Sequence, residues 1–340
     1  MKGNEEGGQD VAKAMQDAVE FLTLHRAVDL VVEKRPIVIS ESMPLCDALK
    51  FLASGWVRAC PVKNATGSII GTLDMRDSCA FLLEMHKTQP VADPTHAKTN
   101  RLIDYIALHS GQGSKHTLRD LAVMRPFRTF PPDTTLLELA RALSRGCHIV
   151  GITDGPAETA GLSKVVTQGM LFKVIHEALS KIQLRARQIM NKPVLSIRFD
   201  SKACKAFEMM VNKSLSGLAV VDEDGIIIHN TSTSDLKTLI TAKDIDDLSL
   251  DMSIEDFLVK LRAGNAGART RVPVSVCKKD EDVSTIISKL MKTGYHRVWI
   301  VNRRKEPSGV LSVSDLFRLV VQNSPLREER RGGSAKCALQ

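Results

Sequence analysis

The segment GVLSVSDLFRLV, residues 309–320, joins a strand pattern to a helix pattern through a short polar cluster. An apolar run leads up to Ser312, and beyond Asp315 apolar residues recur at helical spacing. Ser and Asp side chains at the start of a helix accept hydrogen bonds from the first backbone amides, which lack partners within the helix. A single joint of this kind predicts a helix cap.

The same joint recurs along the chain. Residues 217–240 and 296–320 each read as two apolar strands separated by a charged turn, followed by Ser and Asp at the start of an apolar helix. An earlier copy covers residues 57–83, with Asp77 at the helix start, and another covers residues 148–175. Self-similarity at a fixed period predicts a repeat architecture.

A helical pattern precedes each copy, and a short extended segment precedes each of those helices. The helical segments are residues 44–55, 135–146, 202–213 and 282–294. The extended segments are PIVIS (36–40), FRTF (127–130), PVLSI (193–197) and PVSVC (273–277). The predicted unit is therefore strand, helix, strand, strand, helix, repeated four times. Because such a unit exposes an apolar sheet face, it must pair with a neighbour.

The composition is that of a folded soluble chain with a basic surplus. Its 340 residues suffice for two domains, and its formal net charge is +8. Only two Trp and two Tyr are available for base stacking, which favours small phosphorylated ligands over nucleic acid. A solvated basic surface is the alternative. No apolar run approaches the roughly 20 residues that cross a bilayer. The seven cysteines contain no C-x-x-C pair, so neither a zinc site nor a disulfide framework is expected.

These repeats resemble the CBS domain family, and in detail they resemble the gamma regulatory subunits of AMP-activated and sucrose-nonfermenting-type protein kinases. The resemblance covers about residues 25–322, and the motifs that carry it are VRACPV (57–62), CHIVGITD (147–154), SGLAVVDEDG (216–225) and YHRVWIV (295–301). It implies an α/β (α+β) fold of four CBS repeats, each β-α-β-β-α. The repeats are expected to pair into two Bateman modules that form a disc with nucleotide clefts at its centre.

The expected domain boundaries follow from the repeats. They are a flexible N-terminus (1–20), CBS 1 (21–90), an insertion (91–117), CBS 2 (118–182), CBS 3 (183–247), a linker (248–270), CBS 4 (271–323) and a disordered C-terminal tail (324–340).

The resemblance implies nucleotide-binding residues at the joints and at the strand starts. The ribose-binding aspartates of the family match Asp77, Asp235 and Asp315. The basic residues that approach the phosphates match Arg58, His148, His296 and Arg297. Flanking polar contacts match Ser216, Ser232, Ser312 and Ser314. A carboxylate can accept both hydroxyls of a ribose diol, and helix N-terminal amides favour phosphate oxygens.

Two joints depart from the family pattern. The second repeat has Met170 in place of the aspartate, so its cleft is expected to lack the usual ribose contact and to stay empty. The first repeat has Asp74 and Arg76 in place of hydroxyl residues. A carboxylate beside a phosphate is unfavourable unless Arg76 neutralises it.

A non-enzymatic regulator is expected, because no phosphate-loop, kinase or H-E-x-x-H motif occurs and the repeats use nearly the whole chain. It needs no catalytic cofactor and no metal. The leading hypothesis is an energy-sensing subunit that binds AMP, ADP and ATP, is cytoplasmic or nuclear, and has kinase catalytic (alpha) and beta subunits as partners. The alternatives are a stand-alone four-CBS regulator of the fungal stress-response type acting on a phosphatase, and a purely structural interaction scaffold.

The last four residues, CALQ, fit a C-a-a-X prenylation signal. Cys337 is therefore a candidate farnesylation site, and a membrane is expected as a partner only if this cysteine is prenylated.

Overall fold

The computed structural model describes residues 3–32, 35–55, 57–88, 102–109, 116–155, 161–241, 248–263 and 273–324. Cys337 and the predicted disordered tail beyond residue 324 lie outside the described residues. Among the described residues, no helix combines the length and the apolar character that a membrane span requires.

Four units share one order of elements, as the repeats predict. The first contains β1 (Ile39–Ser40), α2 (Leu45–Ser54), β2 (Ala59–Lys63), β3 (Ile69–Asp74) and α3 (Met75–Thr88). The second contains β4 (Thr129–Phe130), α6 (Leu136–Ser144), β5 (Ile149–Thr153), β6 (Leu162–Thr167) and α7 (Gln168–Ser180). The third contains β7 (Ser196–Arg198), α9 (Ala203–Asn212), β8 (Gly217–Val221), β9 (Ile227–Ser232), the 3-10 turn η3 (Thr233–Asp235) and α10 (Leu236–Thr241). The fourth contains β10 (Val276–Lys278), α12 (Val283–Thr293), β11 (Arg297–Val301), β12 (Pro307–Ser312) and α13 (Val313–Gln322).

Each unit forms a three-stranded sheet with its middle strand in the centre. In the fourth unit, β11 pairs parallel with β10, with Trp299 opposite Val276, and antiparallel with β12, with Arg297 opposite Ser312. A helix must cross over between parallel strands, whereas a tight turn can join antiparallel ones. The predicted mixed α/β fold of four β-α-β-β-α repeats is confirmed.

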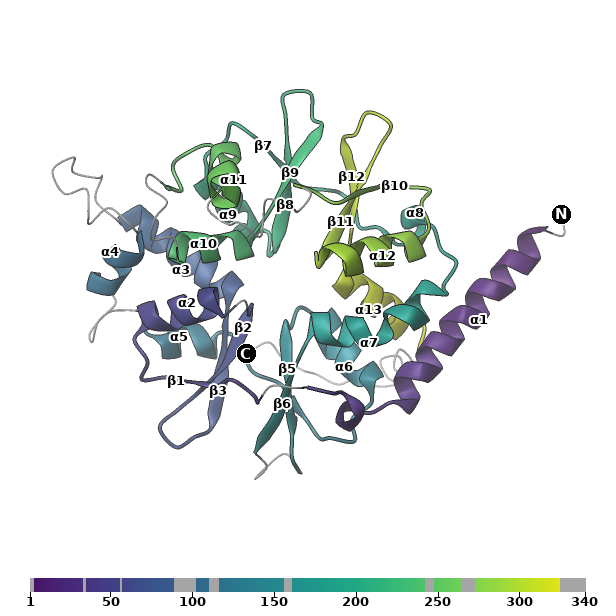
Figure 1. Cartoon of the computed structure of the whole chain (residues 1–340), viewed down its shortest axis with the longest axis horizontal. Coiled ribbons are helices and arrows are strands. Elements are labelled where there is room, and N and C mark those ends of the chain that lie inside the picture. The colour runs from purple at the N-terminus through teal and green to yellow at the C-terminus, as the bar shows by residue number, and fades with distance from the viewer. Residues whose placement is uncertain are drawn as a thin grey trace, which may run out of the picture.

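The units surround a common centre in the order first, third, fourth, second (Figure 1). Helices of the first and third units share one apolar core, in which Leu49 and Leu82 pack with Phe207. Helices of the second and fourth units share another, which contains Leu139 and Phe317. Each such buried side chain stabilises the fold by about 1.5–3 kcal/mol.

Contacts that involve the sheets join the third unit to the fourth and the first unit to the second. Between the third and fourth units, Ala219 and Trp299 lie in one apolar cluster, and Nε1 of Trp299 donates to Oδ1 of Asn230 at 2.9 Å. Between the first and second units, α5 (Leu118–Val123) packs on β3, where Gly71 lets the carbonyl of Ala122 approach. This pairing of the first with the second unit, and of the third with the fourth, is consistent with two Bateman modules.

Several helices lie outside the repeats, and one corrects the expected boundaries. Residues 1–20 were predicted to be flexible, but α1 (Gly3–Leu24) is a helix whose residues Met15, Ala18 and Leu22 are buried in the core of the second and fourth units. Among the described residues, the other elements outside the β-α-β-β-α pattern are η1 (Ala27–Asp29), α4 (Leu102–His109) in the insertion, α5 (Leu118–Val123), α8 (Ala186–Ile189) and α11 (Ile254–Ala263) in the linker.

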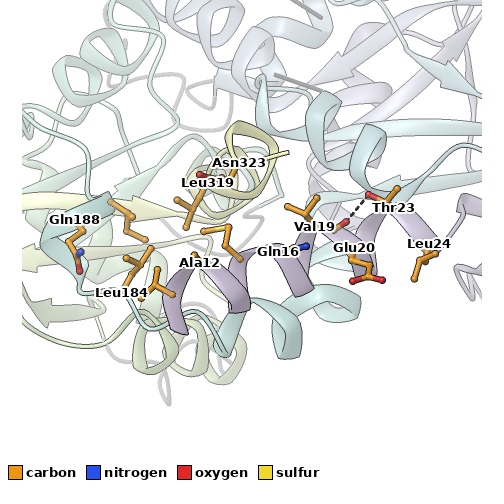
Figure 2. Close-up of a pocket in the computed structure, with 13 residues that line it drawn as sticks. Ala12, Gln16, Val19, Glu20, Thr23, Leu24, Leu184, Gln188, Leu319 and Asn323 are labelled. Atoms are coloured by element: carbon orange, nitrogen blue, oxygen red, sulfur yellow. Dashed lines mark hydrogen bonds between the residues drawn. The ribbon is translucent and has the colours of Figure 1, made fainter. Parts of the chain in front are cut away.

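The helix α1 lies on the outer side of the disc (Figure 1), and a groove runs along it, whose lining residues are drawn in Figure 2. Among the described residues, its other side is formed by Leu184, Gln188, Leu319 and Asn323, and Glu20 is the only charged residue in the lining.

Candidate functional site

The centre of the disc is built from one repeated position. Arg58, His148, Ser216 and His296 each immediately precede the middle strand of their unit. The repeat therefore brings residues far apart in the chain to equivalent places around one centre. The structure thus gathers the predicted phosphate-binding residues Arg58, His148, His296 and Arg297, although their role in binding stays a prediction.

Positive charge accumulates there in a buried setting. Burial and the neighbouring charges of Arg58 and Arg297 lower the pKa of His296 to about 3. Burial and Arg58 also lower the pKa of Arg297 to about 10 and that of Lys237 to about 8. The Nδ1 atom of His296 is buried and makes no well-formed hydrogen bond. Such a cluster disfavours further positive charge and would be stabilised by an anion.

Asp74 partly balances this charge. Its side chain is fully buried, and its Oδ2 atom lies 2.8 Å from Nδ1 of His148. Its Oδ1 atom lies 3.1 Å from Nε of Arg76, whose guanidinium also donates to the carbonyl of Gly146. Burial alone would raise the pKa of Asp74, but His148 and Arg76 hold it well below its ordinary value. Arg76 thus provides the neutralisation that this carboxylate needs, since burial lowers the pKa of His148 and favours its neutral form.

The three predicted ribose aspartates are engaged by protein groups. Both oxygens of Asp77 accept from Arg125, at 2.7 and 2.8 Å. In Asp315, Oδ2 accepts from the amide and hydroxyl of Ser312, at 2.8 and 2.6 Å, and Oδ1 accepts from Arg318 at 2.7 Å. These carboxylates would have to release arginine side chains before they could bind a diol.

Asp235 is a cap of the same kind. Its Oδ2 accepts from the amide of Ser232 at 2.7 Å and from the hydroxyl of Thr231 at 3.1 Å. Burial raises the pKa of this carboxyl and outweighs these hydrogen bonds. The predicted site residues Ser232 and Asp235 thus contact each other at the start of η3.

The remaining predicted serines connect neighbouring units. Ser216 accepts from Nη2 of Arg297 at 2.7 Å, and Gly217 lets the guanidinium lie against the backbone, since a side chain there would collide with it. Ser314 accepts from Nε2 of Gln168 at 2.9 Å. Ser314 thus joins the fourth unit to the second.

A cavity of about 910 Å³ faces the basic cluster. Arg58, His148 and His296 line it, together with Gly169 and Met170 from the joint of the second unit. Its apolar lining includes Ile37, Val57, Ile149 and Val165. The cleft without an aspartate, which was expected to stay empty, is therefore an open cavity of nucleotide size.

Three residues at the centre escaped prediction. Lys237 reaches from α10 to the carbonyl of Val57. Gln168 contacts the fourth unit, and Arg125 lies outside the repeat that it contacts. Their side chains are placed by packing between units, for which the sequence carries no local signal. The one available hint was the position of Lys237, which follows the TSTSD joint (231–235) after a single residue, Leu236.

Comparisons with known proteins agree with this architecture. Residues 186–242 and 269–322 match the family model of the CBS domain. A Methanocaldococcus jannaschii structure, described as a proposed archaeal homologue of gamma-AMPK, has a TM-score of 0.66 at 12% identity, covering 86% of this chain and 99% of that one. An uncharacterised Pyrococcus horikoshii protein has a TM-score of 0.51 at 14% identity, covering 87% and 100%. At these identities the likeness shows the fold alone.

Similar curated proteins are fungal. "Protein sds23" of Aspergillus clavatus is 25% identical over 69% of this chain and 46% of its own length. "Protein SDS23" of Yarrowia lipolytica is 27% identical over 81% of this chain and 56% of its own length. The chain thus spans about half the length of the curated relatives it matches.

These relatives correct the expected partners. They carry the name sds23 and not that of a kinase gamma subunit, so the prediction of kinase alpha and beta partners is wrong. The family match covers the third and fourth units, so the chain contains CBS domains there. The first and second units share the same order of strands and helices, and the arrangement of all four is consistent with paired Bateman modules.

Proposed function

We propose that this protein is a non-catalytic regulator that binds an adenine nucleotide in the central cavity and acts on a protein phosphatase without kinase subunits. The observation that carries the proposal is the buried basic cluster, to which all four units contribute. Its members are Arg58, His148, Lys237, His296 and Arg297.

The cavity offers two kinds of surface to such a ligand. Arg58, His148 and His296 provide donors for a phosphate, and charge-assisted hydrogen bonds of this type are the stronger class. Ile37 and Val165 belong to an apolar lining that suits an adenine ring. The volume of about 910 Å³ lies within the roughly 300–1,000 Å³ of small-molecule sites. Because Met170 replaces the acid, affinity should depend on the phosphates more than on the ribose.

Titration calorimetry on the whole chain tests the ligand. AMP, ADP and ATP should bind, whereas adenosine, which has the same base and ribose but no phosphate, should bind far more weakly. Inorganic phosphate serves as the complementary partial ligand. An absence of heat with all three nucleotides at near-millimolar concentration would remove the nucleotide proposal and leave the interaction scaffold.

The proposal of a phosphatase partner has separate support. The fungal stress-response type is the alternative that the sequence allows, and the similar curated proteins are fungal. Within the described residues, the four units account for most of the chain, which suits a binding role over a catalytic one.

Affinity purification of the tagged chain from cells that express it, with mass spectrometry of the recovered proteins, tests this partner. Phosphatase subunits should be recovered, and the purified chain should alter the phosphatase rate in vitro. Recovery of kinase subunits alone, or an unchanged phosphatase rate, would contradict the proposal.

A further inference from the structure

A second cluster of polar side chains lies where the first and third units meet, away from the centre. It comprises His86 in the last turn of α3, Cys204 in the first turn of α9 and Asp251 ahead of α11. An imidazole nitrogen, a sulfur and a carboxylate oxygen there all lie within 4.8 Å of one another. The proposed nucleotide site uses none of these residues.

Backbone hydrogen bonds hold two of the three donors in place. The amide of Ala203 donates to the carbonyl of Met252 at 2.9 Å, and the amide of Cys204 donates to the carbonyl of Leu250 at 2.8 Å. Asp251 lies between those two carbonyls in the chain, so it is fixed opposite Cys204. Packing of α3 on α9 brings His86 to the same place, on the side of the disc where both helices appear in Figure 1.

The two oxygens of Asp251 have different surroundings. Oδ2 lies 3.3 Å from Nε2 of His86, whereas Oδ1 lies 3.0 Å from Nζ of Lys202. One oxygen thus faces the other donors, and the second has a partner that fixes the carboxylate. Outer partners of this kind commonly orient the carboxylates that bind metals. The Asp251 side chain is 56% exposed, which gives an ion a path from solvent.

We propose that His86, Cys204 and Asp251 form a zinc site that links the first and third units, with water as the fourth ligand. Nitrogen, sulfur and carboxylate oxygen are the donors that Zn²⁺ takes in proteins, at about 2.0–2.3 Å. Calcium and magnesium prefer oxygen ligands throughout, which a thiol and an imidazole do not provide. Small rotations of these three side chains would close the donor separations to a tetrahedral set.

Zinc binds cysteine as the thiolate, so each bound ion displaces the Cys204 thiol proton to solvent. Glu208 follows Cys204 by one helical turn and is held by Lys87 at 2.7 Å.

The site goes beyond the proposed function, because it acts on assembly of the disc and not on the nucleotide cavity. His86 belongs to the first module, and Cys204 and Asp251 belong to the second. An ion that binds only the assembled pair stabilises it by mass action. Sequence spacing could not show this site, since its ligands come from three distant segments.

Zinc titration of the metal-free whole chain against a chromophoric chelator tests the proposal. One equivalent should bind and raise the melting temperature, and Co²⁺ in its place should show a thiolate charge-transfer band. Cys204→Ser and Asp251→Asn should each weaken zinc binding by more than the roughly 10- to 100-fold that loss of an outer partner costs. The matched controls are Cys147→Ser, at the other half-buried cysteine of the described chain, and Asp200→Asn, at an exposed carboxylate.

Circular dichroism shows whether each variant is folded, and His86→Gln provides a third, independent removal of a ligand. Equal zinc affinity in wild type and Cys204→Ser, or cobalt binding without a thiolate band, would overturn the proposal. Both outcomes are independent of whether a nucleotide binds.

Discussion

The strand-to-helix joints of the fourth and second units occupy equivalent positions in their repeats. They differ in whether a carboxylate is present and in whether the joint borders an open cavity. At the fourth, Asp315 accepts from Ser312 and Arg318, so both carboxylate oxygens are engaged. At the second, Thr167 caps the helix by accepting from the amide of Met170 at 3.1 Å, and no carboxylate is present. The second joint opens on the cavity that faces the basic cluster.

This comparison indicates that a Ser and Asp motif at a helix start is not by itself a ligand site. Capping and an arginine engage both carboxylate oxygens of Asp315, and capping contacts engage Oδ2 of Asp235. Access to solvent decides where a ligand can enter. The motif and the cavity therefore lie in different units.

The largest expected effect on stability concerns the first unit. Its last strand ends at Asp74, whereas the corresponding residues are Thr167 in the second unit and Ser312 in the fourth. Asp74→Asn should lower the free energy of unfolding by about 3–5 kcal/mol, because it leaves Arg76 without its buried counter-charge. Urea denaturation measures this loss. Asp200→Asn, at the exposed pair with Arg198, is the matched control and should change little. A loss of under about 1 kcal/mol in Asp74→Asn would show that this joint is an ordinary cap.

Arg58→Ala, at the open cavity, should lower the affinity for AMP far more than it changes the free energy of unfolding. Loss of a charged hydrogen bond costs about 1.5–3 kcal/mol, so AMP affinity should fall by roughly 10- to 150-fold. The free energy of unfolding should change little, because the substitution removes both repulsion with Arg297 and attraction to Asp74. Arg304→Ala, at a 77% exposed side chain, makes the same charge change at the rim. Equal AMP affinity in both variants would place the ligand elsewhere.

The stability of the nucleotide-free chain should depend on pH through His296. Its folded pKa of about 3 lies below the unfolded value, so the unfolded state binds more protons between the two. Stability is thus complete above about pH 6.5 and should fall by about 2 kcal/mol on acidification to about pH 5. His296→Gln should reduce this slope but not abolish it, since His229, with a pKa of about 4, acts in the same direction. Urea midpoints across this range that do not move would contradict the buried, neutral imidazole.

Asp315→Ala and Thr167→Ala compare the two caps directly. Each should cost about 0.5–2 kcal/mol of unfolding free energy, because each removes an acceptor at a helix start. Neither should change the number of nucleotides bound per chain in calorimetry. If only Asp315→Ala lost one bound nucleotide, Asp315 would bind a ribose, as the sequence predicts.

The smallest effect on binding should come from introducing a carboxylate at Met170, in the joint of the second unit. Met170→Asp offers a ribose diol an acceptor, worth about 0.5–1.5 kcal/mol, or roughly 2- to 13-fold tighter adenosine binding. Met170→Asn is the uncharged control. Unchanged adenosine binding in both variants would mean that the ribose does not face this residue.

Much of the fold could be predicted, because strand and helix periods persist in every repeat. The predicted helix between the first two strands of each unit, such as residues 202–213 for α9 (Ala203–Asn212), agrees with the structure to within about two residues at either end. The helix α1 was missed, since its polar and Gly-rich start indicates flexibility, and Leu22 is buried only against the second and fourth units.

The candidate site could be predicted only where the repeat itself determines it. Arg58, His148 and His296 converge because they hold one repeated position. The pairing of Asp77 with Arg125 depends on a residue that precedes the first strand of the second unit and lies outside the β-α-β-β-α pattern, so no alignment of the four copies could reveal it.

A crystal structure of the whole chain grown with AMP distinguishes the open cavity from the Ser and Asp joints as the nucleotide site. One nucleotide is expected in the cavity beside Met170, with its phosphate within hydrogen-bonding distance of Arg58 and His296. A nucleotide held instead by Asp235 or Asp315, with the cavity beside Met170 empty, would contradict this expectation.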